Sequence, residues 1–144
     1  LIRNDVVAEL RTWIGTRYHH GSGVKGAGVD CLMLIVRTGQ AVGIRARDIV
    51  IPPYSPQFNL HRGAETYLEG LLGYMREVDT PEPGDIALWQ FGRCFSHAAI
   101  VSQWPRIIHA HTRAGVVIEE NADSARWLMF VGNDRRAVKF LSLW

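Results

Sequence analysis

Cysteine and histidine are the residue types of this 144-residue chain whose spacing could support covalent chemistry. Cys31 directly follows Asp30, a residue type that often caps the start of a helix, so the cysteine would lie in the first helical turn. The partial positive charge at a helix N-terminus stabilises a thiolate, the attacking form of cysteine. Cys31 is therefore a candidate nucleophile. The alternative is a small apolar residue packed on a buried helix.

Three histidines follow at strand-like positions. His97 begins the run HAAIV, in which alternation would put His97 and Ala99 on one face and leave room for a partner side chain. His109 and His111 are two residues apart in IIHAHT and would face the same way in a strand. One of them could orient His97, as the third member of a catalytic triad does. A histidine at the surface or the edge of the core is the simpler interpretation of His97.

Metal binding and a disulfide are two other possible uses of these residues. Cys31 and the three histidines are a possible zinc ligand set, but the short ligand spacings of most structural zinc sites are missing. We therefore expect no metal and no cofactor. A disulfide between Cys31 and Cys94 is the other alternative. Two cysteines in 144 residues do not make a disulfide scaffold, so free thiols are expected and Cys94 is interpreted as incidental.

Helices are predicted first along the chain. Asn4 or Asp5 can cap a helix whose apolar residues recur at helical spacing until Gly15. Residues 15–29 contain five glycines and are predicted to form a loop. A buried helix follows from Cys31 to about Gly43. The proline-containing stretch 44–62 is predicted to be irregular, and 63–73 to form an amphipathic helix.

Strands are predicted in the second half. Turn signals at Gly92, at Trp104-Pro105 and at Ala114-Gly115 separate the apolar runs IALWQF, HAAIVSQ, RIIHAH and GVVIEE, which are typical of an antiparallel meander. Asp85, after Pro83 and Gly84, is explained by turn chemistry. The tail is predicted to give a short helical turn and a last strand. Helices followed by strands indicate an α+β class in a single domain, residues 1–144, with about five strands.

Composition narrows the function classes. The net charge is +2 without a run of basic residues, which does not argue for nucleic-acid specificity, although an anionic polymer such as a cell wall would suit it. No apolar stretch of 18 residues is present, so no membrane span is expected. The first residues lack the features of a secretory signal, so we expect another component to carry the protein to its place of action.

Three stretches together resemble the NlpC/P60 family of cell-wall cysteine peptidases, and more narrowly its phage-tail and gene-transfer-agent branch. The matching stretches are WIGTRYHHGSGVKGAGVDC at 13–31, PEPGDIALWQFGRCFSHAAIV at 81–101 and IIHAHTRAGVV at 107–117. They cover most of the chain and occur in the order of the family.

The resemblance implies a papain-like core and hydrolysis of the γ-D-glutamyl–diamino acid bond in peptidoglycan stem peptides. Cys31 matches the nucleophile, His97 the general base and His109 the polar third member, with His111 as the alternative to His109. Tyr18 matches a tyrosine near the active site, where its hydroxyl and the Cys31 backbone N–H could stabilise an oxyanion. Asp30 precedes the nucleophile. His111 and His20 are candidates for the rim of the site.

The resemblance also implies a setting. The chain would be a tail-tip component of a virion or tail-like particle, acting in the wall or periplasm of the target bacterium beside other tail-tip or baseplate proteins. Leu32 and Met33 replace the small residue and glycine that follow the cysteine in many relatives, which bears on substrate range. The alternatives are a structural tail-tip or hub protein with weak hydrolysis, and another papain-like amidase or acyltransferase.

Overall fold

Helix α2 (Cys31–Ala41) begins where the sequence predicts, because Asp30 caps it. A computed structural model describes residues 3–43, 73 and 75–144 of the chain. In it, the Asp30 carboxylate accepts a hydrogen bond from the backbone N–H of Met33, and the helix begins at Cys31. This contact satisfies one of the N–H groups that a helix leaves unpaired at its start. The predicted cap and the predicted start of the helix are both confirmed.

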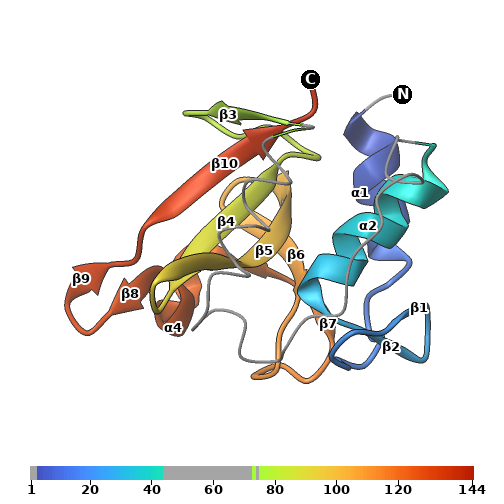
Figure 1. The fold of residues 1–144 in the computed structure, drawn as a ribbon, viewed down its shortest axis with the longest axis horizontal. Coiled ribbons are helices and arrows are strands. Elements are labelled where there is room, and N and C mark those ends of the chain that lie inside the picture. Colours follow the sequence, from blue (N-terminus) through green and yellow to red (C-terminus); the bar gives the residue numbers. More distant parts are fainter. Residues whose placement is uncertain (1–2, 44–72, 74) are drawn as a thin grey trace.

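Helix α1 (Arg3–Arg11) lies beside α2, and both pack on the same side of the main sheet (Figure 1). Its buried residues Val6, Val7 and Leu10 recur at helical spacing, as the sequence predicts. The helix ends at Arg11, four residues before the predicted end at Gly15. The predicted irregular segment 44–62 and the predicted helix 63–73 lie outside the residues that the structure describes, except for residue 73.

Within the described residues, six strands form one antiparallel sheet in the order β3-β10-β4-β5-β6-β7. The meander runs as predicted, and its strands are β4 (Ile86–Phe91), β5 (Cys94–Gln103), β6 (Arg106–Ala110) and β7 (Val117–Asn121). The tail adds β10 (Val138–Ser142). The prediction of about five strands is one short, because the edge strand β3 (Arg76–Val78) has no apolar alternation in its sequence.

The sheet separates two hydrophobic clusters. Helices α1 and α2 cover the face that carries Leu88, Ala98 and Ile100. The opposite face carries Trp89 and Ala99 and is covered by η3 (Ala122–Ser124) and α4 (Arg126–Met129), beside the small hairpin of β8 (Phe130–Val131) and β9 (Asp134–Arg135). Figure 1 shows these elements at the lower left. The predicted alternation of residues 97–100 is therefore confirmed.

The loop before α2 is shaped by glycine. It contains a small antiparallel hairpin of two short strands, β1 (Gly23–Val24) and β2 (Gly28–Val29), which the sequence does not predict. A Cβ atom at Gly28 would lie 2.8 Å from the Cβ of His19, closer than any real contact, so only glycine fits there. The loop is bound to the β6–β7 turn, since the Tyr18 N–H donates to the Gly115 carbonyl. A parallel bridge between Tyr18 and Val29 also holds Tyr18 close to the start of α2.

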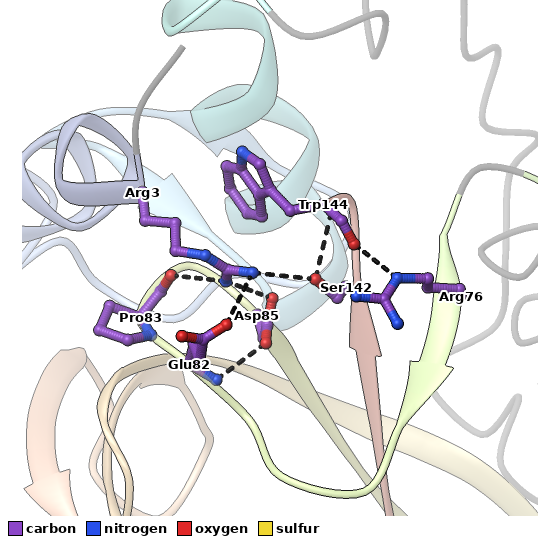
Figure 2. A network of polar contacts seen from close by, with 7 residues as sticks. All are labelled: Arg3, Arg76, Glu82, Pro83, Asp85, Ser142 and Trp144. Carbon is purple, nitrogen blue, oxygen red and sulfur yellow. Dashed lines mark hydrogen bonds and ion pairs between the residues drawn. The ribbon is translucent and has the colours of Figure 1, made fainter.

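A polar network joins the first helix to the last strand (Figure 2). The Arg3 guanidinium donates to the Asp85 carboxylate at 2.7 Å and to the Pro83 carbonyl at 3.0 Å, and it reaches the hydroxyl of Ser142 in β10. Asp85 also accepts the backbone N–H of Glu82, so the turn contact that the sequence suggests is present. Asp85 does more than shape a turn, because it is the buried partner that holds α1 against the sheet.

Candidate functional site

The Cys31 thiol lies against the backbone of β5, where it contacts the peptide groups on both sides of His97. Its sulfur is 3.9 Å from the carbonyl oxygen of Ser96, and the backbone N–H of Ala98 also interacts with it. A β-bulge brings the strand into this position: the pairing passes from Trp89 with His97 to Gln90 with Phe95, so Ser96 is the extra residue. Bulges bend a strand and re-aim its groups, and they are common beside active sites. The structure thus places the predicted nucleophile at the peptide groups that flank the predicted base.

A chain of three side chains leads away from His97. Its Nε2 lies 2.8 Å from Nδ1 of His109, and Nε2 of His109 lies 2.7 Å from a carboxylate oxygen of Glu120. His97 is buried and His109 is completely buried, whereas the Glu120 side chain is 25% exposed. Because Nε2 of His97 is taken by His109, Nδ1 is the nitrogen left to exchange a proton with a thiol. Of the two histidines considered as the third member, His109 is the one bonded to His97.

Aromatic rings surround this chain. The ring of His111 meets that of His97 edge to face, with centroids 4.9 Å apart, and Trp127 of α4 lies 4.1 Å from His111 and stacks on His109. Phe91 adds an edge contact to His97. His111 is partly exposed, and His20 lies 3.9 Å from the carboxylate of Asp30, the residue before Cys31.

Burial, and after it the neighbouring charges, favour the neutral forms of Cys31 and His97. Burial, and next the negative charge of Asp30, raise the pKa of Cys31 to about 12, although nearby backbone N–H groups act in the opposite direction. Burial and the neighbouring His109 and His111 hold the pKa of His97 well below its usual value. The expectation of a thiolate stabilised by the helix N-terminus is therefore not met: at neutral pH the resting pair is a thiol and a neutral imidazole.

Tyr18 and Asp30 lie with Cys31 at the start of α2. Burial raises the pKa of the Tyr18 hydroxyl to about 12, and the charges of Cys31 and Asp30 add to this shift, so the hydroxyl stays protonated and can donate a hydrogen bond. Asp30 is buried and accepts the backbone N–H of Gly21 at 2.7 Å in addition to that of Met33. Asp30 thus connects the glycine loop to the helix that bears the thiol.

Metal and disulfide chemistry were the other uses considered for these residues. Among residues 3–43, 73 and 75–144, no group of three or more His, Cys, Asp or Glu side chains is arranged to hold a metal ion. Cys31 and Cys94 are separate free thiols, and both are buried. In the same part of the chain, no helix is long and apolar enough to cross a membrane.

Comparison with solved structures decides the fold. The NlpC/P60 domain of the peptidoglycan hydrolase SagA has a TM-score of 0.63 to this chain at 19% identity, covering 99% of this chain and 98% of that one. The chain has the NlpC/P60 fold. This papain-like α+β fold is the one that the sequence predicts. No protein-family model matches the sequence, and no curated protein matches it either.

Other NlpC/P60 structures show how the fold is used. NlpC1 from Trichomonas vaginalis has a TM-score of 0.60 at 16% identity, and the match covers 95% of this chain but 42% of NlpC1, so the chain spans less than half the length of that protein. RipD from Mycobacterium tuberculosis has a TM-score of 0.58 at 14% identity, with 100% and 98% covered, and is described as a non-catalytic NlpC/p60 domain protein adapted to peptidoglycan binding. The NlpC/P60 fold therefore occurs with and without catalysis.

Three residues at this site were not predicted from the sequence: Ser96, Glu120 and Trp127. Glu120 lies in the run GVVIEE, whose alternation alone could have placed it on one face of β7. Its meeting with His109 depends on the register, in which His109 pairs with Ile118 and Glu120 is the diagonal neighbour. The six residues between β6 and β7 left that register open.

Proposed function

We propose that this protein is a cysteine peptidase that cleaves the peptide part of bacterial peptidoglycan, with Cys31 as nucleophile, His97 as general base and His109 as the residue that orients His97. The observation that supports it best is a thiol at a helix start that contacts the backbone next to a strand histidine, and a second histidine bonded at 2.8 Å to Nε2 of that histidine. A purely structural role needs none of these contacts.

The first step is a proton transfer. His97 accepts the proton of the Cys31 thiol at Nδ1, and the resulting thiolate attacks the carbonyl carbon of the scissile amide. Because the resting pair is neutral, we infer that the proton moves when substrate fills the site, and that no thiolate–imidazolium pair is stored beforehand. His97 then donates this proton to the leaving amine. A water molecule, deprotonated by His97, hydrolyses the thioester and regenerates the thiol.

The negative charge on the carbonyl oxygen needs donors. The protonated hydroxyl of Tyr18 and the backbone N–H of Cys31 are the groups we propose for this role. Asp30 acts through position, because its carboxylate holds the start of α2 and the glycine loop together. His111, with Trp127 against it, would form part of the wall on which the stem peptide lies.

The bond we propose is the γ-D-glutamyl–diamino acid amide of the stem peptide, and the setting is the tip of a virion tail or tail-like particle that opens the wall during DNA delivery. Both rest on the resemblance of the three sequence stretches. Other tail-tip or baseplate proteins would then be its partners. Particles carrying Cys31→Ala should assemble normally and fail to penetrate the wall.

Digestion of purified peptidoglycan tests the enzyme. The wild-type protein should release amino groups, and mass spectrometry of the soluble fragments should locate the cleaved bond. Cys31→Ala should abolish the release of amino groups while circular dichroism shows that the fold is kept. Cys94→Ala, the matched change at the other buried cysteine, should retain the release of amino groups. Full activity in Cys31→Ala, or loss of wild-type activity on adding a chelator alone, would exclude this mechanism.

A second candidate is a wall-binding or structural tail-tip protein without turnover. It is favoured by the deep burial of the thiol, which is 9% exposed, and by the raised pKa of Cys31. RipD has the same fold and is described as non-catalytic. Binding of the wild-type protein to intact peptidoglycan, with no fragments released, would select this candidate over the peptidase.

A further inference from the structure

Glu120 is the one ionisable group of the buried chain that the proposed mechanism does not yet use. It lies on β7, and its carboxylate is 2.7 Å from Nε2 of His109. The neighbouring Glu119 is bound instead to Arg11, Arg106 and Ser102, so the two adjacent carboxylates serve different contacts. The contact between Glu120 and His109 is an ion pair when the ring is protonated, and a hydrogen bond to a ring nitrogen when the ring is neutral. The direction of that hydrogen bond depends on where the protons lie.

The protons along this chain are coupled. An ionised carboxylate accepts only, so Nε2 of His109 must carry a proton and donate it to Glu120. A neutral imidazole has one N–H, which leaves Nδ1 of His109 as an acceptor. Nδ1 of His109 faces Nε2 of His97 at 2.8 Å, so Nε2 of His97 must be the donor. The other nitrogen of His97 then has a free lone pair.

We propose that Glu120 is a positioning residue that sets the tautomers of His109 and His97, so that Nδ1 of His97 is left unprotonated and able to take the proton of the Cys31 thiol. The catalytic part of this inference rests on the proposed function. The assignment of the tautomers does not depend on the proposed function. With a protonated Glu120 the whole chain can reverse: the carboxyl donates to Nε2 of His109, Nδ1 of His109 donates to His97, and Nδ1 of His97 carries the proton and cannot act as a base.

The low pKa of His97 agrees with this role, because both rings must be neutral for a single direction to hold. Burial of His97 and His109 keeps water from supplying alternative donors and acceptors. The Glu120 side chain is 25% exposed, while its carboxylate touches the fully buried ring of His109. Glu120, at the partly exposed end of the three side chains, thus determines which nitrogen of His97 at the buried end is protonated.

Nitrogen-15 NMR of the histidine rings tests the tautomers without any substrate. In the wild-type protein at pH 7.5, Nδ1 of both His97 and His109 should give the shift of an unprotonated nitrogen, and both Nε2 atoms that of a protonated one. Signals are assigned with His97→Gln and His109→Gln. A protonated Nδ1 on His109 in the wild type would overturn the proposal, and this reading needs no variant of Glu120 to fold.

Glu120→Gln then tests the cause. Its amide can donate or accept, so the fixed direction should be lost and the Nδ1 shift of His109 should move toward the protonated value. The alkylation rate of Cys31 by iodoacetamide, located by mass spectrometry, should fall about 10- to 100-fold, a loss typical of removing an orienting partner. Glu119→Gln, the matched change on the same strand, should alter neither the Nδ1 shift of His109 nor the alkylation rate of Cys31. Unchanged shifts in Glu120→Gln would overturn the proposal.

Peptidoglycan digestion separates this inference from the proposed function. Where the wild-type protein cleaves, Glu120→Gln should lower kcat by the same factor as alkylation, with KM little changed, because Glu120 acts through His109 on the base. Where the wild-type protein does not cleave, the peptidase proposal fails, whereas the NMR shifts and the alkylation rates still decide whether Glu120 sets the tautomers.

Discussion

The carbonyl oxygen of Ser96 lies 3.9 Å from the sulfur of Cys31, and Ser96 is the extra residue of a β-bulge between β4 and β5. The backbone N–H of Ala98, two residues on, interacts with the same sulfur. The thiol of α2 is therefore held by the peptide groups on both sides of His97, at the point where β5 departs from a regular ladder.

The stability of the protein should fall at high pH through Cys31. The native state binds the thiol proton more tightly than the unfolded chain, since the pKa rises from 9.0 to about 12. Stability due to this group is thus fully present below about pH 9 and is lost between pH 9 and 12, at a rate of up to about 1.4 kcal/mol per pH unit. Urea unfolding from pH 8 to 11 should show a steeper decline for the wild type than for Cys31→Ser. Parallel curves would contradict the raised pKa.

Acid should destabilise the protein through His97 and His111. Burial lowers the pKa of His111 to about 4 and that of His97 well below 6.5, so the native state binds fewer protons than the unfolded chain. The stability from these groups is present above pH 6.5 and is lost as the pH falls toward 4. His111→Gln should flatten the decline over this range in thermal unfolding. A decline as steep as in the wild type would show that His111 titrates normally.

Asp30 should have two separable effects. Asp30→Asn keeps an oxygen for the Met33 N–H but removes the charge that helps to raise the pKa of Cys31, so alkylation of Cys31 at pH 8 should become faster. Asp30→Ala loses the cap as well and should lower the free energy of unfolding by about 1 kcal/mol or more relative to Asp30→Asn. Equal alkylation rates for the wild type and Asp30→Asn would show that the charge does not act on the thiol.

Removal of Arg3 should weaken the attachment of α1. Asp85 is 1% exposed, and Arg3 is its ion-pair partner at 2.7 Å, so Arg3→Leu leaves a buried carboxylate with only the Glu82 N–H. The expected cost is on the order of 3 kcal/mol in urea unfolding. Arg76→Leu, at the exposed contact with the Trp144 carbonyl in the same network (Figure 2), should cost under about 1 kcal/mol. Similar costs for both changes would contradict this role of Asp85.

Local signals explain what the sequence predicts correctly. Asp30 caps the helix that begins at Cys31, and the run IALWQF coincides with β4, because a cap and an apolar strand are determined by neighbouring residues. Alternation within each strand puts His97 on the face of Ala99, and His109 on the face of His111. The direct contact between His97 and His109 depends on how these strands are paired, which the family order made expected and the atomic distances now describe.

Long-range features explain what the sequence does not predict. The helix N-terminus at Cys31 was expected to favour a thiolate, but burial by the sheet and the charge of Asp30 outweigh it. Burial by the sheet cannot be read from the residues next to Cys31, whereas the charge of Asp30 could have been, since Asp30 directly precedes it. Strand β3 was missed because its residues are mostly exposed and its pairing with β10 joins segments more than 60 residues apart. Glu120 was missed because the β6–β7 register was open.

The guanidinium of Arg3 lies 4.3 Å from the centre of the Trp144 ring, so two residues at opposite ends of the described chain touch. A short glycine linker could therefore join these ends without moving α1 or β10. New ends could be opened at the exposed tip of the β8–β9 hairpin, between Gly132 and Asn133. Such a circular permutant would keep the thiol, both histidines and Glu120 in one fold, while β9 and β10 would become the first strands synthesised and no longer the last.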